Sequence, residues 1–130
     1  MQGARAKVAH DICPNGWHVP SEAEWTMLFN YLGGESEAGG KMKETGTLHW
    51  KSPNMGASNI AKFTILPSGG ADFVKFNGYY GLHTNAYFWS SSCGIRSGSA
   101  LELGFDHNEK WIWKQYTSKT EALSVRCILD

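Results

Sequence analysis

The sequence predicts one α+β domain, with a helix near the beginning of the chain and an antiparallel sheet in its second half. Three observations point to this class. An apolar repeat with helical spacing follows a good capping residue, Ser21. Three strand-like segments succeed one another between residues 86 and 116, and 130 residues suffice for one core but not for two ordinary ones.

The helix is predicted to begin after Ser21 and to end at Gly33-Gly34. Ser21 and Glu24 have the spacing of a capping box, in which each residue hydrogen-bonds the other's backbone N–H. Glycine favours the left-handed backbone that ends many helices. Residues at offsets of three, four and seven form one apolar face, which we expect to be buried: Trp25, Leu28, Phe29 and Leu32.

The middle of the chain is predicted to be rich in loops. Glu35–Gly40 has the composition of a loop, and Lys41–Gly46 is long enough for one helical turn only. Thr47–Asn59 is expected to be a loop pinned to the core by aromatic residues. Phe63–Pro67 is predicted to be a strand or an extended segment, and Ala71–Gly81 a looped hairpin.

Three antiparallel strands are predicted next, at Ala86–Ser90, Ser99–Asp106 and Trp111–Tyr116. The second alternates as a half-buried strand does, with Leu101, Leu103 and Phe105 facing inward and Ala100, Glu102 and Gly104 facing outward. A last strand, Leu123–Ile128, is expected to bring Cys127 to the core. Residues 1–12 are interpreted as an extension or a short edge strand, and residues 13–130 as the domain.

The composition excludes several classes of partner. Twelve basic and twelve acidic residues give a net charge of zero, which disfavours nucleic acid and anionic membrane surfaces. Since no run of eighteen apolar residues occurs, we expect no membrane insertion of this domain. The first residues also lack the apolar segment of a signal peptide, so we expect any export signal of the parent protein to lie outside this chain.

The three cysteines, Cys13, Cys93 and Cys127, lack the spacing of a zinc site, and no metal or cofactor is predicted. A bridge from Cys13 to Cys127 would close a loop of more than 100 residues, which the chain-entropy model values at about 4.7 kcal/mol. Such a bridge would imply an oxidising compartment. The alternative is that both are buried free thiols of a cytosolic protein. Cys93 is expected to be an exposed thiol.

Several motifs carry a family resemblance over residues 13–130. They are Ile12-Cys13-Pro14-Asn15-Gly16-Trp17-His18-Val19-Pro20-Ser21, Glu24-Trp25, Leu32-Gly33-Gly34, residues 38–46, His49-Trp50, Ser52-Pro53-Asn54, Phe63, Leu66-Pro67, residues 88–91 and Ser124-Val125-Arg126-Cys127. In this order they resemble the Fibrobacter succinogenes major paralogous domain, a module of secreted and surface proteins. The chain departs from the family's usual Gly-Phe at Ala122-Leu123.

The resemblance implies a C-type-lectin-like fold, with an N-terminal helix, long loops, a twisted antiparallel sheet and adjacent chain ends. It also implies the Cys13–Cys127 bridge, since these are the family's cysteine positions. The fold is distantly similar to formylglycine-generating-enzyme-like domains, a similarity that concerns fold and not chemistry. It is similar also to retroelement-diversified lectin-fold proteins, whose final strands and loops vary to contact ligands.

Catalysis and calcium-dependent sugar binding both lack a sequence signature. Cys93 could be a nucleophile and His83 or His107 a base, but no local motif links them, so we expect no enzyme. Ser52-Pro53-Asn54 resembles the Glu-Pro-Asn of calcium lectins but lacks its carboxylate, so a turn is the preferred interpretation.

The candidate binding surface lies between Ser92 and Thr117, because Trp, Tyr and Arg are frequent binding anchors. The predicted ligand-binding residues are Ile95, Arg96, Ser97, Glu102, His107, Asn108, Trp111, Trp113, Gln115 and Tyr116. This hypothesis requires Arg96, His107, Trp111, Trp113 and Tyr116 to form one exposed patch. The remaining tryptophans, Trp17, Trp25, Trp50 and Trp89, are assigned to the core.

These observations predict a non-enzymatic, extracellular binding module. It would bind a protein or glycan through its C-terminal strands and loops, on a surface that could be diversified. We expect a monomeric module of a larger protein. The alternative is a structural spacer or adhesin subunit without a ligand site.

Overall fold

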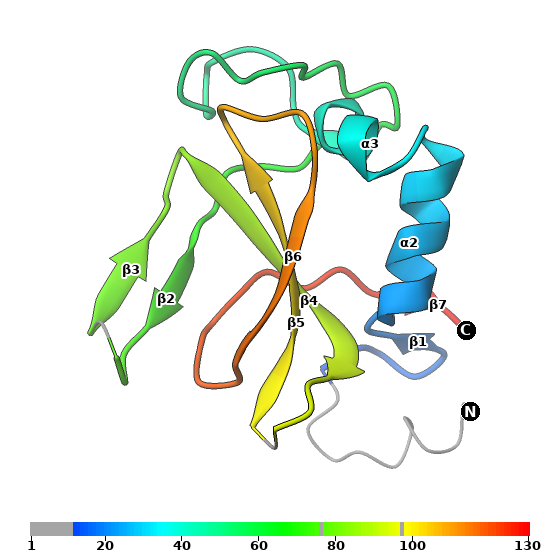
Figure 1. Ribbon diagram of the computed structural model, residues 1–130, viewed down its shortest axis with the longest axis vertical. Helices are drawn as coiled ribbons and strands as arrows, with labels where there is room; N and C mark the ends of the chain where they lie inside the picture. Colours follow the sequence, from blue (N-terminus) through cyan, green and yellow to red (C-terminus); the bar gives the residue numbers. More distant parts are fainter. Residues whose placement is uncertain (1–11, 76, 97) are drawn as a thin grey trace.

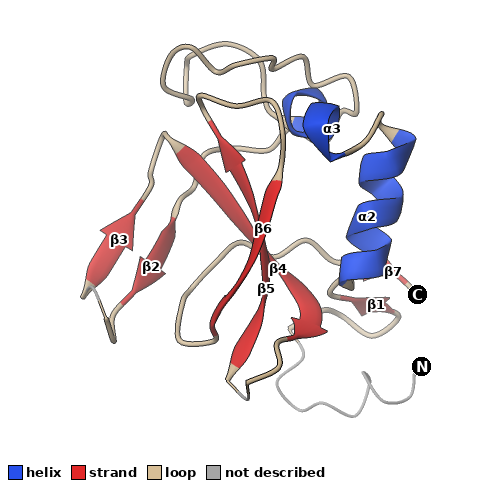
Figure 2. Cartoon of the chain, in the orientation of Figure 1, coloured by secondary structure: helices blue, strands red, loops and turns tan. Residues whose placement is uncertain are grey.

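A computed structural model of the protein describes residues 12–75, 77–96 and 98–130. Within them lie the helices α2 (Glu22–Tyr31) and α3 (Glu35–Met42). The strands are β1 (Trp17–His18), β2 (Gly70–Asp72), β3 (Gly78–Tyr80), β4 (Asn85–Cys93), β5 (Ser99–Asp106), β6 (Trp113–Ser118) and β7 (Ile128–Leu129). They form three antiparallel sheets, β1-β7, β2-β3 and β4-β5-β6 (Figures 1 and 2). The α+β class is thereby confirmed.

The helix α2 begins and ends as its sequence predicts. The Ser21 hydroxyl accepts a hydrogen bond from the Glu24 N–H, and the Glu24 carboxylate accepts one from the Ser21 N–H. This capping box stabilises the first turn by about 1 kcal/mol. The predicted apolar face packs against the sheet: Trp25, Phe29 and Leu32 are buried in the core, and Leu28 packs against it.

The prediction of a loop at Glu35–Gly40 is wrong, because these residues belong to α3. Two glycines, poor helix formers, allow this helix to approach neighbouring backbone closely. A Cβ on Gly39 would lie 2.7 Å from Lys110 O, and one on Gly40 would lie 2.3 Å from Gly56 O. The Gly40 N–H also donates to Lys110 O at 2.9 Å. Contacts distant in the sequence therefore outweigh the local preference.

The three-stranded sheet separates a main core from a second packed face. In Figure 1 the helices flank this sheet on one side and the β2–β3 hairpin stands on the other. The main core combines the helices with Ala86, Phe88, Leu103, Phe105 and Ile112. The predicted hairpin at Ala71–Gly81 and the antiparallel pairing of the three later strands are confirmed. The last of these strands, β6, begins at Trp113 and not at Trp111, because the Ile112 N–H donates to Glu35 O.

The central strand β5 is buried on both faces, which corrects the prediction of an exposed face at Ala100, Glu102 and Gly104. These residues face the hairpin side of the sheet. The Trp113 indole lies on Gly104, and Tyr80 of the hairpin packs against Tyr87 of β4. A second layer of side chains therefore covers what the sequence alone suggests is a solvent face.

Both ends of the described chain meet beside α2. Cys13 and Cys127 form a disulfide with their Cα atoms 5.9 Å apart, as predicted, and β1 pairs with β7. The expected strand over 123–128 is reduced to β7 and to a bridge between Ser124 and Phe88 of β4. The expected extension or edge strand at 1–12 lies, apart from its last residue, outside the described residues.

The aromatic and extended segments follow the predictions in part. Trp25 and Trp50 are buried as expected, and Trp89 is half-buried. Trp17 is wrongly assigned to the core: it is 43% exposed, because β1 lies at the molecular edge in a two-stranded sheet. The prediction of a strand or extended segment at Phe63–Pro67 holds only at Ile65, which forms a single bridge with Lys43, because Thr64 has a left-handed backbone with φ 52°.

Candidate functional site

The predicted binding residues fall into three separate groups. Ile95 and Arg96 lie in the β4–β5 loop, and Ser97 lies outside the described residues. Tyr116 pairs with Leu101 near this end of the sheet. His107, Asn108 and Trp111 lie in the β5–β6 loop at the opposite end, and Glu102, Trp113 and Gln115 lie on the hairpin side of the sheet.

The single exposed patch that the sequence hypothesis requires is therefore not formed. Arg96 and Tyr116 are exposed near the start of β5, whereas His107 and Trp111 follow its end. An eight-residue strand separates these positions by about 25 Å, since a strand rises about 3.3 Å per residue. Trp113 lies between them and packs on Gly104. Residues that are close in the sequence therefore lie at opposite ends of the strand β5.

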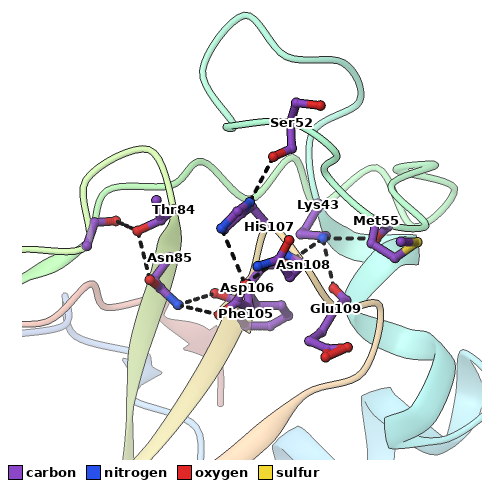
Figure 3. Close-up of polar contacts among 11 residues, drawn as sticks. Lys43, Ser52, Met55, Thr84, Asn85, Phe105, Asp106, His107, Asn108 and Glu109 are labelled. Atoms are coloured by element: carbon purple, nitrogen blue, oxygen red, sulfur yellow. Dashed lines mark hydrogen bonds and ion pairs between the residues drawn. The ribbon is translucent and has the colours of Figure 1, made fainter.

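The β5–β6 loop is organised by Lys43, which the sequence analysis did not single out. Figure 3 shows its ammonium among three backbone carbonyls. Lys43 Nζ donates to Met55 O at 3.0 Å, to Asp106 O at 2.8 Å and to Glu109 O at 2.9 Å. The ammonium also lies 5.2 Å from the centre of a Trp50 ring, a cation–π contact.

Lys43 is fully buried, at 0% exposure. Burial lowers the pKa of Lys43 to about 8, while the charges of Asp106 and Glu109 act in the opposite direction. The side chain is thus protonated at neutral pH, and three carbonyls occupy its three N–H donors. Lys43 is therefore a structural cation that joins the segment after α3 to the end of β5 and the β5–β6 loop, and no donor is left for a ligand.

His107 and Asn108, two predicted binding residues, belong to the same network. His107 Nδ1 donates to Ser52 O at 3.1 Å, and the Asn108 N–H donates to Asp106 Oδ1 at 2.7 Å. Backbone bonds from Met55 N to His107 O and from His107 N to Thr84 O hold the loop further. His107 and Asn108 thus hold the β5–β6 loop in place at the end of β5, as Figure 3 shows.

Cys93, His83 and His107, the residues considered for catalysis, each contact other groups. His83 Nδ1 donates to His49 O at 2.8 Å, just as His107 donates to Ser52 O. Cys93 is exposed, as predicted, and its sulfur lies 3.8 Å from Lys119 Nζ.

The hairpin side of the sheet carries the other candidate site. We define the aromatic–acid cluster as Tyr80, Tyr87, Glu102, Trp113, Gln115, Thr117 and Glu121. Strand pairing creates it, because Glu102 lies opposite Gln115, and Gly104 lies opposite both Trp113 and Tyr87. Alternation then places these side chains on one face. The cluster draws on four strands and on the segment that follows β6.

Three aromatic rings form the floor of the cluster. A Cβ on Gly104 would lie 2.0 Å from Trp113 Cε2, so the indole rests directly on the β5 backbone. The Trp113 and Tyr87 ring centroids are 5.6 Å apart, and those of Tyr87 and Tyr80 are 5.5 Å apart, both with edge-to-face geometry. Such pairs contribute about 0.5–1.5 kcal/mol beyond the area that they bury. The rings are therefore held in fixed orientations.

Two carboxylates lie among these rings. Glu102 is 2% exposed, and its Oε2 accepts a hydrogen bond from Gln115 Nε2 at 2.6 Å. Its Oε1 is buried and accepts no hydrogen bond from the described residues. The Glu121 carboxylate accepts hydrogen bonds from the Tyr80 and Thr117 hydroxyls. One buried acceptor of the cluster is thus left without a donor.

The cluster carries negative charge that no neighbouring base balances. Within the part of the chain that the structure describes, no ion pair reaches Glu102 or Glu121, whereas Lys114 pairs with Glu22 and Glu35 on the helix side. Burial raises the pKa of Glu102, the Gln115 hydrogen bond opposes this, and the charge of Glu121 adds to it. Burial, with the charge of Glu102 next, raises the pKa of Tyr87 to about 12. An anionic state of this site is therefore costly without a ligand.

Sequence reasoning found only part of this cluster. Glu102, Trp113 and Gln115 were among the predicted binding residues, and the structure brings them together. Tyr87 and Thr117, on the neighbouring strands, were missed. Tyr80 and Glu121 were missed too, since they come from the hairpin and from the segment after β6, which no local pattern links to the sheet. The adjacent tyrosines at 79 and 80 were the available signal.

Within the described residues no helix is long and apolar enough to cross a membrane, and no group of three or more histidine, cysteine or acidic residues could hold a metal ion.

Comparison with known proteins identifies the family of the chain. No curated protein and no solved structure matches the chain. The family model of the Fibrobacter succinogenes major domain matches residues 2–129, and the chain belongs to that family.

Proposed function

We propose that the protein is a non-enzymatic, extracellular module that binds a glycan over the aromatic–acid cluster. One observation carries this proposal: an aromatic platform, with Trp113 flat on Gly104, adjoins the buried Glu102 carboxylate whose Oε1 lacks a donor. Sugar rings offer apolar faces that suit aromatic rings and hydroxyl donors that suit carboxylates. Trp113 is half-buried and Gln115 exposed, so both can meet a ligand.

The proposed extracellular location is supported by the Cys13–Cys127 disulfide, since such bonds persist mainly in oxidising compartments. The C-type-lectin-like fold stays a prediction that agrees with this location. It rests on the family resemblance, as does the idea of a diversified surface.

The proposal is tested with the oxidised protein on a glycan array, followed by calorimetry on any hit. Trp113→Ala should weaken binding at least tenfold, which is about 1.4 kcal/mol. The matched control is Trp111→Ala, because Trp111 is 43% exposed and lies outside the cluster; it should leave the affinity within about twofold. If Trp113→Ala fails to fold, Trp113→Phe serves instead, since it keeps a smaller ring over Gly104 and should weaken binding by less. Equal effects of the Trp111 and Trp113 variants would contradict the proposal.

A structural module without a ligand site is the second candidate. The observation that favours it is the closure of both ends of the described domain by the disulfide and by β1–β7 pairing, which suits insertion into a longer surface protein. A properly oxidised domain that binds neither glycans nor extracellular proteins would favour this role. A third arrangement, protein binding through the exposed Ile95 and Arg96 of the β4–β5 loop, predicts that sequences from related strains vary mainly in residues 92–116.

A further inference from the structure

We infer that the aromatic–acid cluster takes a sugar that carries a protonated amine, with the ammonium group placed at Glu102. This inference rests on the proposed glycan binding and names the class of glycan. It follows from the charge of the cluster, from its rings and from the position of Gln115.

The charge of the cluster favours a cation. Glu102 and Glu121 lie close enough to affect each other's charge state, and within the described residues neither has a basic partner. A buried carboxylate without a counter-charge is expensive, and a bound ammonium removes this cost by supplying charge and donors together. A neutral hydroxyl would supply a donor only.

The rings favour an organic cation over a metal ion. Tyr80, Tyr87 and Trp113 pack on one another beside the acids, and the faces of such rings attract ammonium groups. Calcium instead takes six to eight oxygen ligands. The described residues of the cluster offer two carboxylates among hydrophobic rings, a poor match to such a shell.

Gln115 occupies the place of the ligand amine. Its Nε2 donates to Glu102 Oε2 at 2.6 Å, in the manner of an ammonium N–H, and the side chain lies on β6, at the edge of the sheet. Gln115 is exposed whereas Glu102 is 2% exposed. Rotation of the Gln115 side chain away from the sheet would open Glu102 to an incoming amine. Gln115 is thus a neutral, displaceable cover of the carboxylate.

The test compares two oligosaccharides of equal length, one of glucosamine and one of N-acetylglucosamine, which differ in the charge of the amino group. Calorimetry on the oxidised domain should give at least tenfold tighter binding of the glucosamine form. Glu102→Gln should reduce this binding at least tenfold and that of the acetylated form by less, so that the preference for the amine is lost. Gln115→Ala should tighten binding of the glucosamine form, because the competing amide is gone. A purely structural Gln115 would give no such gain.

The controls separate specific from diffuse attraction. Glu37→Gln makes the same charge change at a surface ion pair with Lys110, far from the cluster in the fold, and should leave the affinity within about twofold. Equal loss in the Glu37 and Glu102 variants would overturn the inference. Equal binding of both oligosaccharides would overturn the amine but keep glycan binding. Absence of any glycan hit on the array would overturn both proposals.

Discussion

Replacing Lys43 by methionine should destabilise the domain by about 3–5 kcal/mol, the range found when one partner of a buried charged network is removed. Methionine has a similar length and fills the same space, but it cannot donate to Met55 O, Asp106 O or Glu109 O. Each carbonyl then loses a charged hydrogen bond, of about 1.5–3 kcal/mol, while relief of the buried charge offsets part of the sum.

The measurement is urea unfolding at pH 7 with the disulfide intact, followed by circular dichroism. Lys41→Met is the matched control, because Lys41 lies in the last turn of α3, two residues before Lys43, is half-buried and donates to one carbonyl, Leu32 O, at 2.8 Å. It should cost about 1 kcal/mol. If Lys43→Met costs no more than Lys41→Met, the description of Lys43 as the cation that joins the segment after α3 to the β5–β6 loop is wrong.

Three further predictions concern the buried acid, the disulfide and the helix glycines. Glu102→Gln should raise the stability at pH 7, since the amide removes a buried charge that has no basic partner among the described residues. The pKa of Glu102 is higher in the folded state than in the unfolded state, so the native protein loses stability as the pH rises from the unfolded to the folded pKa. The gain in stability of the variant should therefore shrink towards pH 4 in urea titrations. Paired Cys13→Ser and Cys127→Ser changes should cost about 2–5 kcal/mol in unfolding free energy, whereas Cys93→Ser should be close to neutral; equal stability of the paired variant would refute this. Gly40→Ala should lower the Tm although alanine favours helices by about 1 kcal/mol, because the new Cβ would lie 2.3 Å from Gly56 O and overpacking costs about 1–3 kcal/mol; a higher Tm would show that the backbone can yield there.

The sequence predictions were correct where the interacting residues are close in the sequence, and failed where they are distant. Ser21, Glu24 and the apolar face of α2 interact within two turns, so the helix and its start were predicted correctly. The helix α3 was missed because Gly39 and Gly40 are poor helix formers in isolation. Their close contacts with Lys110 and Gly56 lie outside the short stretch of sequence from which a helix is predicted.

The candidate site shows the same limit. Alternation in β5 correctly divided its residues between two faces, but it assigned Glu102 and Gly104 to solvent, since polar and small residues usually lie there. The cover over that face comes from Trp113 and from Tyr80 of the hairpin. Lys43 gave no signal, because a lysine is ordinarily a surface residue and only three distant carbonyls explain its burial.

The joined ends of the domain have a mechanical consequence. A pulling force applied before Cys13 and after Cys127 would pass through the disulfide between them and would bypass the core. The Cα atoms of the two cysteines are 5.9 Å apart. After reduction the same force would have to unravel the domain, and the 114-residue separation could extend to a length on the order of 400 Å. In a larger protein the oxidised domain would thus be an inextensible link, and its aromatic–acid cluster would keep its shape under load.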